Sequence, residues 1–159
     1  MPGRGHCIRM QQTKTWLISA AVVFVVLFNL GYVFHDLLLG PWFHEQIPFA
    51  REHYVIPYLA LAFAAYALIL SYLFPAFHAF HPQRSIWANG LRFGLLMGVL
   101  FDALQGGIIE VATFEGMPIE VFLVDSGYHV FVEGSLGGLL AAAVSARRAS
   151  RLARSAVAG

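Results

Sequence analysis

The residues best suited to chemistry form a regular series in the third apolar segment of the sequence. Every fourth residue is glycine or acidic, and the series reads Gly90, Gly94, Gly98, Asp102, Gly106 and Glu110. Residues four apart lie close to one face of an α-helix. The spacing therefore predicts a helix face that combines close packing with carboxylate chemistry, and Gln105 falls at the edge of that face.

A matching series occupies the fourth apolar segment, where Asp125, His129 and Glu133 are each four residues apart. Gly137 and Ala141 continue the same face with small side chains. Small residues let neighbouring membrane helices approach closely. We therefore expect a packing interface formed by Gly90, Gly94, Gly98, Gly106, Gly134 and Gly138.

The depths of the two series in a membrane can be matched, because a short Gly-Met-Pro turn makes the segments antiparallel neighbours. At about 1.5 Å rise per residue, Asp102 and Glu133 lie near the bilayer centre. Glu110 and Asp125 lie about 12 Å further out, with His129 between the two levels. A charge at the bilayer centre costs at least ~2.5 kcal/mol. These groups are therefore expected to face one another, a water-filled cavity or a partner protein.

Carboxylates held this close cannot all ionise cheaply, so at least one is expected to hold a proton. Such a site suits proton exchange or the capture of a divalent cation. The first candidates for metal ligands are Asp102, His129 and Glu133. One ion cannot bind both Asp125 and Glu133, because eight helical residues separate them by about 12 Å. The loop after the first apolar segment adds three further candidates, His35, Asp36 and His44.

No cofactor motif accompanies these residues. The sequence has no phosphate-binding glycine loop, no nucleophile elbow and no paired cysteines, since Cys7 is its only cysteine. Haem with two axial histidines would need a second membrane histidine at the depth of His129, and the predicted spans contain none. The cofactor is left open, with a divalent metal as the candidate.

Composition indicates which elements must position these residues. Of the 159 residues, 58% are hydrophobic and 12% are charged, about half the charged share typical of soluble domains. A helix needs about 20 mostly apolar residues to cross a membrane. The sequence thus predicts a single all-α domain, a membrane four-helix bundle with spans at about 16–34, 55–74, 91–113 and 119–146. Pro75 is expected to end the second span.

The basic residues predict the orientation. The chain has ten Lys and Arg residues, and all except Arg51 lie in or beside three segments. These segments are the N-terminal tail (1–14), the connection between spans two and three, and the C-terminal tail (147–159). The positive-inside rule places such segments in the cytoplasm. We therefore expect both termini in the cytoplasm and a bacterial-type inner (plasma) membrane, since the chain has the general look of small four-helix bacterial inner-membrane proteins.

Three functions fit these features. The first is handling of protons or a divalent cation, in transport or sensing, by an oligomer, because four short helices seldom enclose a path alone. The second is an accessory or assembly subunit of a larger membrane complex. The third is a membrane enzyme that acts on a lipid or hydrophobic small molecule, with His129 and a carboxylate as acid and base. The expected partners are membrane lipid and further copies or other membrane subunits. Nucleic acid is excluded, because the basic residues form no continuous face.

Overall fold

The structure is a computed structural model that describes residues 3–47, 55–101, 108 and 118–157. Within these residues every regular element is helical, and no β-strand occurs. The α-helices are α1 (Gly3–Tyr32), α2 (Gly40–Gln46), α3 (Ile56–Ala79), α4 (Ile86–Gly98), α6 (Ile119–Gly127) and α7 (Ser135–Val157). Two π-helical turns complete the fold, η1 (Val33–Leu38) after α1 and η3 (Tyr128–Gly134) between α6 and α7. The segment 119–157 is consequently one uninterrupted helix.

Three helical segments are long and apolar enough to cross a membrane, namely Thr13–Leu38, Ile56–Ala79 and Ile119–Ser150. A fourth, Ile86–Phe101, is apolar but shorter. Most of the remainder of the predicted third span lies outside the described residues. These features indicate an all-helical membrane protein.

The second span is longer than the sequence predicts. Pro75 lies inside α3, which continues to Ala79. Proline has no N–H, so the Ser71 carbonyl loses the hydrogen bond that residue 75 would normally donate. Membrane helices tolerate this loss where neighbouring groups satisfy the freed carbonyl. The chain turns after Ala79, and Ser85 caps the start of α4. Its hydroxyl oxygen accepts a hydrogen bond from the Ala88 N–H.

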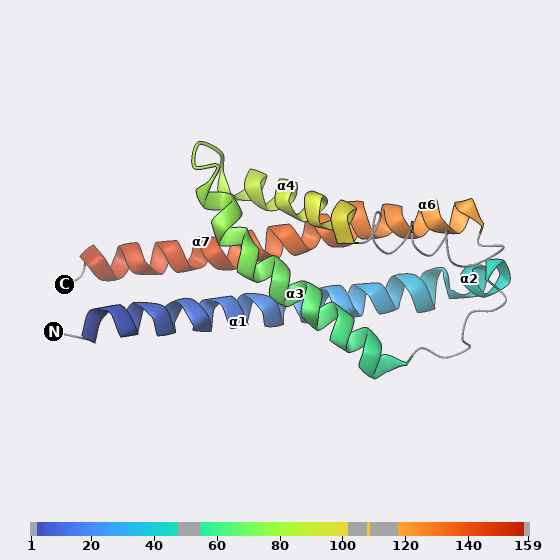
Figure 1. Cartoon of the computed structure of the whole chain (residues 1–159), viewed down its shortest axis with the longest axis horizontal. Coiled ribbons are helices and arrows are strands. Elements are labelled where there is room, and N and C mark those ends of the chain that lie inside the picture. The colour runs from blue at the N-terminus through green and yellow to red at the C-terminus, as the bar shows by residue number, and fades with distance from the viewer. Residues whose placement is uncertain (1–2, 48–54, 102–107, 109–117, 158–159) are drawn as a thin grey trace.

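α1 and the η3–α7 helix run along one common direction (Figure 1). α1 and α7 lie side by side, so the first residue of α1 and the last residue of α7 are at the same end of the molecule. α3 crosses α1 obliquely, and α4 packs along α7 and η3. α2 and α6 occupy the end opposite the termini. The two π-helical turns therefore meet in the half of the bundle that is remote from the termini.

The backbones of α4 and the η3–α7 helix are in direct contact. A Cβ added at Gly94 would overlap the carbonyl oxygen of Gly134, and one added at Gly138 would overlap the carbonyl oxygen of Gly90. A Cβ at Gly98 would lie 2.8 Å from a backbone atom of η3. Since only glycine allows this approach, the spacing of these residues fixes the register between the two helices.

Apolar side chains fill the remaining space between the helices. One buried cluster joins α3, α4 and α7, and it consists of Leu70, Phe74, Phe93, Met97, Ala141 and Ala142. A second cluster joins α1 to α3 and comprises Val23, Leu27 and Ala67. Close packing of this kind makes the relative positions of the helices sensitive to added volume.

A fully buried amide holds the turn between α3 and α4. The Asn89 Nδ2 atom donates to the His81 carbonyl oxygen at 2.9 Å and lies 2.7 Å from His78 Nδ1. Because the amide nitrogen is the donor in both contacts, His78 Nδ1 is the acceptor. Both histidines are thus engaged in shaping this turn.

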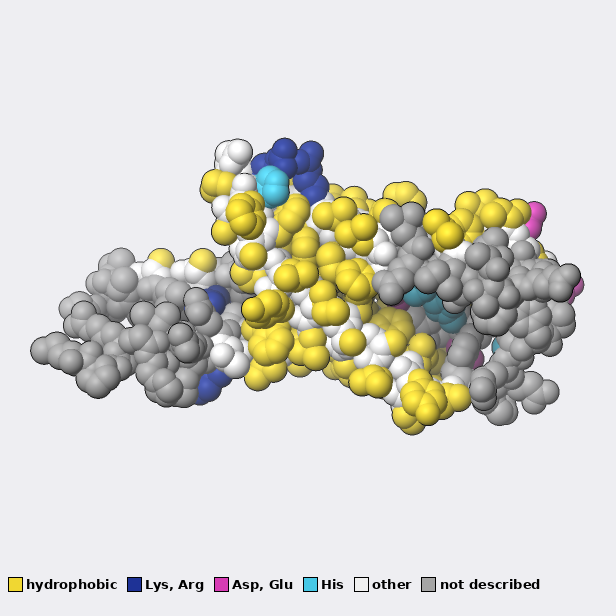
Figure 2. Space-filling view, viewed as in Figure 1, with side chains coloured by type: hydrophobic (Ala, Val, Ile, Leu, Met, Phe, Trp, Pro, Cys, Tyr) yellow, Lys and Arg dark blue, Asp and Glu magenta, His cyan; other side chains and the backbone are white. Residues whose placement is uncertain are grey.

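The surface is banded by side-chain type (Figure 2). Hydrophobic side chains cover the middle of the visible face, Lys and Arg lie toward the end that holds the termini, and Asp and Glu lie at the other end. Large apolar residues are well exposed on the described helices, including Leu61 at 67% and Phe131 at 71%. Such a continuous apolar surface is typical of a helix bundle in contact with lipid.

The glycine contact leads to a stability prediction. Gly94→Ala should destabilise the bundle by about 1–3 kcal/mol or more, because the new Cβ must push the two backbones apart. Gly127→Ala is the matched control, since no described atom lies within 4 Å of a Cβ added there. The measurement is the unfolding midpoint of both variants in the same detergent. Equal midpoints for the two variants would contradict the described contact.

Candidate metal centre

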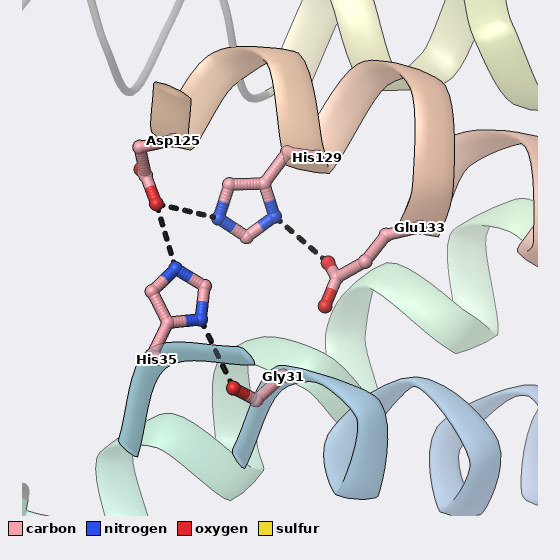
Figure 3. Close-up of polar contacts among 5 residues, drawn as sticks. All are labelled: Gly31, His35, Asp125, His129 and Glu133. Carbon is pink, nitrogen blue, oxygen red and sulfur yellow. Dashed lines mark hydrogen bonds and ion pairs between the residues drawn. The ribbon is translucent and has the colours of Figure 1, made fainter. Parts of the chain in front are cut away.

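The side chains of His35, Asp125, His129 and Glu133 converge between α1 and the η3–α7 helix (Figure 3). Both histidines lie in π-helical turns, His35 in η1 and His129 in η3. A π-helical turn widens the helix locally and redirects its side chains, and such turns recur at functional sites. The two distorted turns therefore bring together residues that are about 90 positions apart in the chain.

His35 is held by the backbone of its own helix. Its Nδ1 atom lies 3.0 Å from the Gly31 carbonyl oxygen, which can only accept a hydrogen bond. In the tautomer that carries the proton on Nδ1, the ring donates to Gly31. In a neutral imidazole this leaves the lone pair on Nε2, and Nε2 lies 2.6 Å from Asp125 Oδ1. A lone pair and a carboxylate oxygen repel each other at that distance unless a cation, a proton or a metal ion, lies between them.

His129 is held in an equivalent way by a carboxylate. Its Nδ1 atom donates to Glu133 Oε2 at 2.8 Å, one turn further along the helix. Its Nε2 atom faces Asp125 Oδ1 at 3.7 Å. Both histidines thus use Nδ1 to bind an acceptor and direct Nε2 toward the same oxygen of Asp125.

The exposed fraction of the polar side chains decreases from Asp125 to Glu133. The side chains of Asp125, His35 and His129 are 28%, 21% and 18% exposed, whereas that of Glu133 is 3% exposed. Glu133 Oε1 has no hydrogen-bond partner among the described residues. A Cβ added at Gly31 would lie 3.2 Å from this oxygen, so the glycine leaves the space that the carboxylate occupies.

Aromatic rings enclose the histidines on the side of α2. The rings of Phe34 and Tyr128 stack with centroids 3.7 Å apart, which ties η1 to η3. Phe43 of α2 is buried and stacks on His35 at 5.5 Å. The His35 and His129 rings also lie face to face, with centroids 5.3 Å apart. These contacts restrict the orientation of both imidazoles and limit the access of water.

The arrangement offers donor atoms suited to a metal ion. One ligand atom each from His35, Asp125 and His129 lies within 4.8 Å of the others. A tetrahedral zinc ion with nitrogen and oxygen ligands needs them about 3.3 Å apart, so on binding the pair at 2.6 Å would open and the pair at 3.7 Å would close. In metal sites a ligating histidine usually donates its other N–H to a carbonyl or carboxylate. Gly31 and Glu133 occupy those two supporting positions.

The structure places the predicted site residues in different locations. His129, Glu133 and Asp125 lie together on one helix face, and Glu133 stands beside His129, not beside Asp125. His44 donates from Nδ1 to the Gly40 carbonyl oxygen at 2.7 Å and belongs to no metal-ligand group among the described residues, and the same holds for Asp36. The other predicted site and packing residues, Asp102, Gln105, Gly106 and Glu110, lie outside the described residues.

Two features of the site escape the sequence analysis. The expectation that no second histidine lies at the depth of His129 is wrong. The first apolar helix continues past Phe34 to Leu38, and the His35 ring lies against the His129 ring. Gly31, whose carbonyl oxygen orients His35, carries no chemical signal of its own. The available signal is the spacing of Gly31 and His35, since residues four apart are neighbours on a helix.

Comparison with known protein families, with curated proteins and with solved structures finds no match.

The geometry predicts the tautomer of each histidine in its neutral form. His35 and His129 should carry the proton on Nδ1, because each Nδ1 faces an acceptor. His78 is the internal control and should carry it on Nε2, since its Nδ1 accepts from Asn89. Nitrogen-15 NMR of the imidazoles at alkaline pH measures this directly. An Nε2-protonated His129 would contradict the site as described.

Proposed function

We propose that the chain binds a divalent transition-metal ion through His35, Asp125 and His129. The observation that carries the proposal is the common orientation of the two histidines. Each Nδ1 is taken by an acceptor, and each Nε2 is directed at Asp125 Oδ1. A metal ion at the meeting point would be bound by both Nε2 atoms and by the carboxylate together.

The donor set favours particular metals. Two imidazole nitrogens and one carboxylate oxygen suit Zn²⁺, Fe²⁺, Co²⁺ or Ni²⁺. Ca²⁺ and Mg²⁺ prefer sites built from oxygen ligands only. Three protein ligands leave a coordination position open, and water or an exchanging ligand can fill it. An open position and a partly exposed Asp125 fit an ion that enters and leaves, as transport or sensing requires.

The placement of the site supports a role on the outer side of the membrane. Basic side chains gather toward the end of the bundle that holds the termini. The two histidines of the site lie in η1 and η3, in the other half. By the positive-inside rule the basic end faces the cytoplasm of a bacterial-type inner membrane. The metal would then be reached from the outer side. We further propose that transport would need an oligomer, because four short helices seldom enclose a complete path alone.

The same residues support proton exchange as a second candidate function. Polar contacts run without interruption from Glu133 through His129 and Asp125 to His35 (Figure 3). The contact of 2.6 Å between His35 and Asp125 has the length of a hydrogen bond, so a proton satisfies it without any movement of the two side chains. Metal binding to the purified protein separates the two candidates.

The metal proposal predicts stoichiometric binding. The full chain in detergent should bind one Zn²⁺ or Co²⁺ per protomer in isothermal titration calorimetry. His129→Gln and Asp125→Asn should each weaken binding by more than about 100-fold, because removal of a ligand costs more than removal of a supporting group. Retention of helicity in circular dichroism would establish that both variants are folded.

His44→Gln is the matched control, because His44 makes the same backbone contact as His35 but lies outside the site. It should bind the metal like the unmodified chain. If all three variants bind alike, the metal proposal fails. Absence of binding to the unmodified chain, together with proton release that depends on Asp125, would favour the proton candidate.

A separate prediction concerns the role of Glu133. Glu133→Gln should weaken metal affinity by about 10–100-fold while the stoichiometry is retained, because Glu133 orients His129 and increases its basicity. Glu120→Gln is the control, since Glu120 is an exposed carboxylate on the same uninterrupted helix. A complete loss of binding in Glu133→Gln would mean that Glu133 is itself a ligand, in conflict with the described geometry.

A further inference from the structure

A second polar site lies in the half of the bundle nearer the termini, away from the histidines. A cavity of about 550 Å³ opens there between α1, α3 and α7. Its lining is rich in hydroxyl groups and includes Ser19, Ser71 and Ser145 together with Arg148. None of the described lining residues is acidic. The cavity is within the usual size range of small-molecule sites, about 300–1,000 Å³.

Ser71 lines the cavity with a polar group that is unpaired within the described part of the chain. The residue is 4% exposed, and its hydroxyl has no hydrogen-bond partner among the described residues. Pro75, which also lines the cavity, cannot donate the helical hydrogen bond to the Ser71 carbonyl. An unpaired buried hydroxyl is costly and uncommon, so a group from outside the chain is the natural partner for Ser71.

Arg148 gives the cavity its charge. The residue is half-buried and makes no ion pair within the part of the chain that the structure describes. A guanidinium group binds phosphate in a bidentate manner, and hydroxyl groups complete such sites. A positive charge among hydroxyls, with no carboxylate beside it, selects an anion.

The other walls of the cavity are aromatic. Trp16 is fixed by its Nε1–H, which donates to the Leu68 carbonyl oxygen at 3.2 Å, and its ring meets Tyr72 edge-on at 5.7 Å. Tyr72 is 66% exposed on the apolar flank of the bundle. Tryptophan and tyrosine are enriched at the level of lipid headgroups. The ligand thus meets an anion-binding interior and an apolar, lipid-facing opening.

We propose that this cavity binds one anionic phospholipid, with its phosphate on Arg148 and Ser71 and its acyl chains leaving past Trp16 and Tyr72. The site is independent of the proposed metal centre. It differs from general attraction of a basic tail to the membrane surface, because it assigns binding to one arginine and one serine.

Native mass spectrometry of the full chain with equimolar phosphatidylglycerol and phosphatidylcholine tests the proposal. The unmodified chain should retain one phosphatidylglycerol in preference to phosphatidylcholine. Arg148→Gln should reduce that retention by at least about tenfold, since a charge-assisted contact is lost. Ser71→Ala should reduce it by a smaller factor. Arg147→Gln is the matched control, because Arg147 is exposed and absent from the lining, and the variant has the same net charge.

The outcomes decide between defined alternatives. A large loss in Arg148→Gln with little change in Arg147→Gln supports the proposal. Equal losses in the two arginine variants would overturn it, because binding would then depend only on net charge. Equal retention of phosphatidylcholine would overturn it as well. Displacement of the lipid by inorganic phosphate at comparable concentration would also overturn it, since the site would then recognise a soluble anion.

Discussion

Burying a carboxylate in apolar surroundings costs several kcal/mol unless hydrogen bonds and opposite charge compensate for it. Glu133, with a side chain only 3% exposed, places this constraint in the middle of the longest helix. The His129 N–H satisfies one of its oxygens, and this contact turns the other ring nitrogen toward Asp125. The orientation of the site therefore follows from the need to stabilise one buried acid.

The glycine contacts make this arrangement possible. Gly94 and Gly134 bring the backbones of α4 and the η3–α7 helix together, and η3 is the turn that carries His129 and Glu133. On the opposite side, Gly31 gives the Glu133 carboxylate room against α1. The position of η3 is thus fixed from both sides by residues without side chains. Added volume on either side would displace the acid and, with it, the histidine.

The sequence predicts some of these features because they are local. Four-residue spacing places Asp125, His129 and Glu133 on one helix face, and apolar length identifies three of the four predicted spans as helices long enough to cross a membrane. His35 contributes through a contact between helices about 90 residues apart. The periodicity within one segment does not predict a contact with another segment. The sequence does not predict the π-helical turns either, because their residues have no distinctive composition. The prediction that Pro75 ends the second span is wrong, because a proline that ends a helix in water can be accommodated inside a membrane helix.

X-ray absorption at the zinc edge of the full chain, loaded with one equivalent of Zn²⁺, tests whether η1 and η3 share a metal centre. A shared centre should give a first shell with two imidazole nitrogens and at least one carboxylate oxygen, and the imidazole signal should fall by half in His35→Gln. A shell of oxygen atoms alone, a shell containing sulfur, or a spectrum unchanged in His35→Gln would contradict a metal centre shared between η1 and η3.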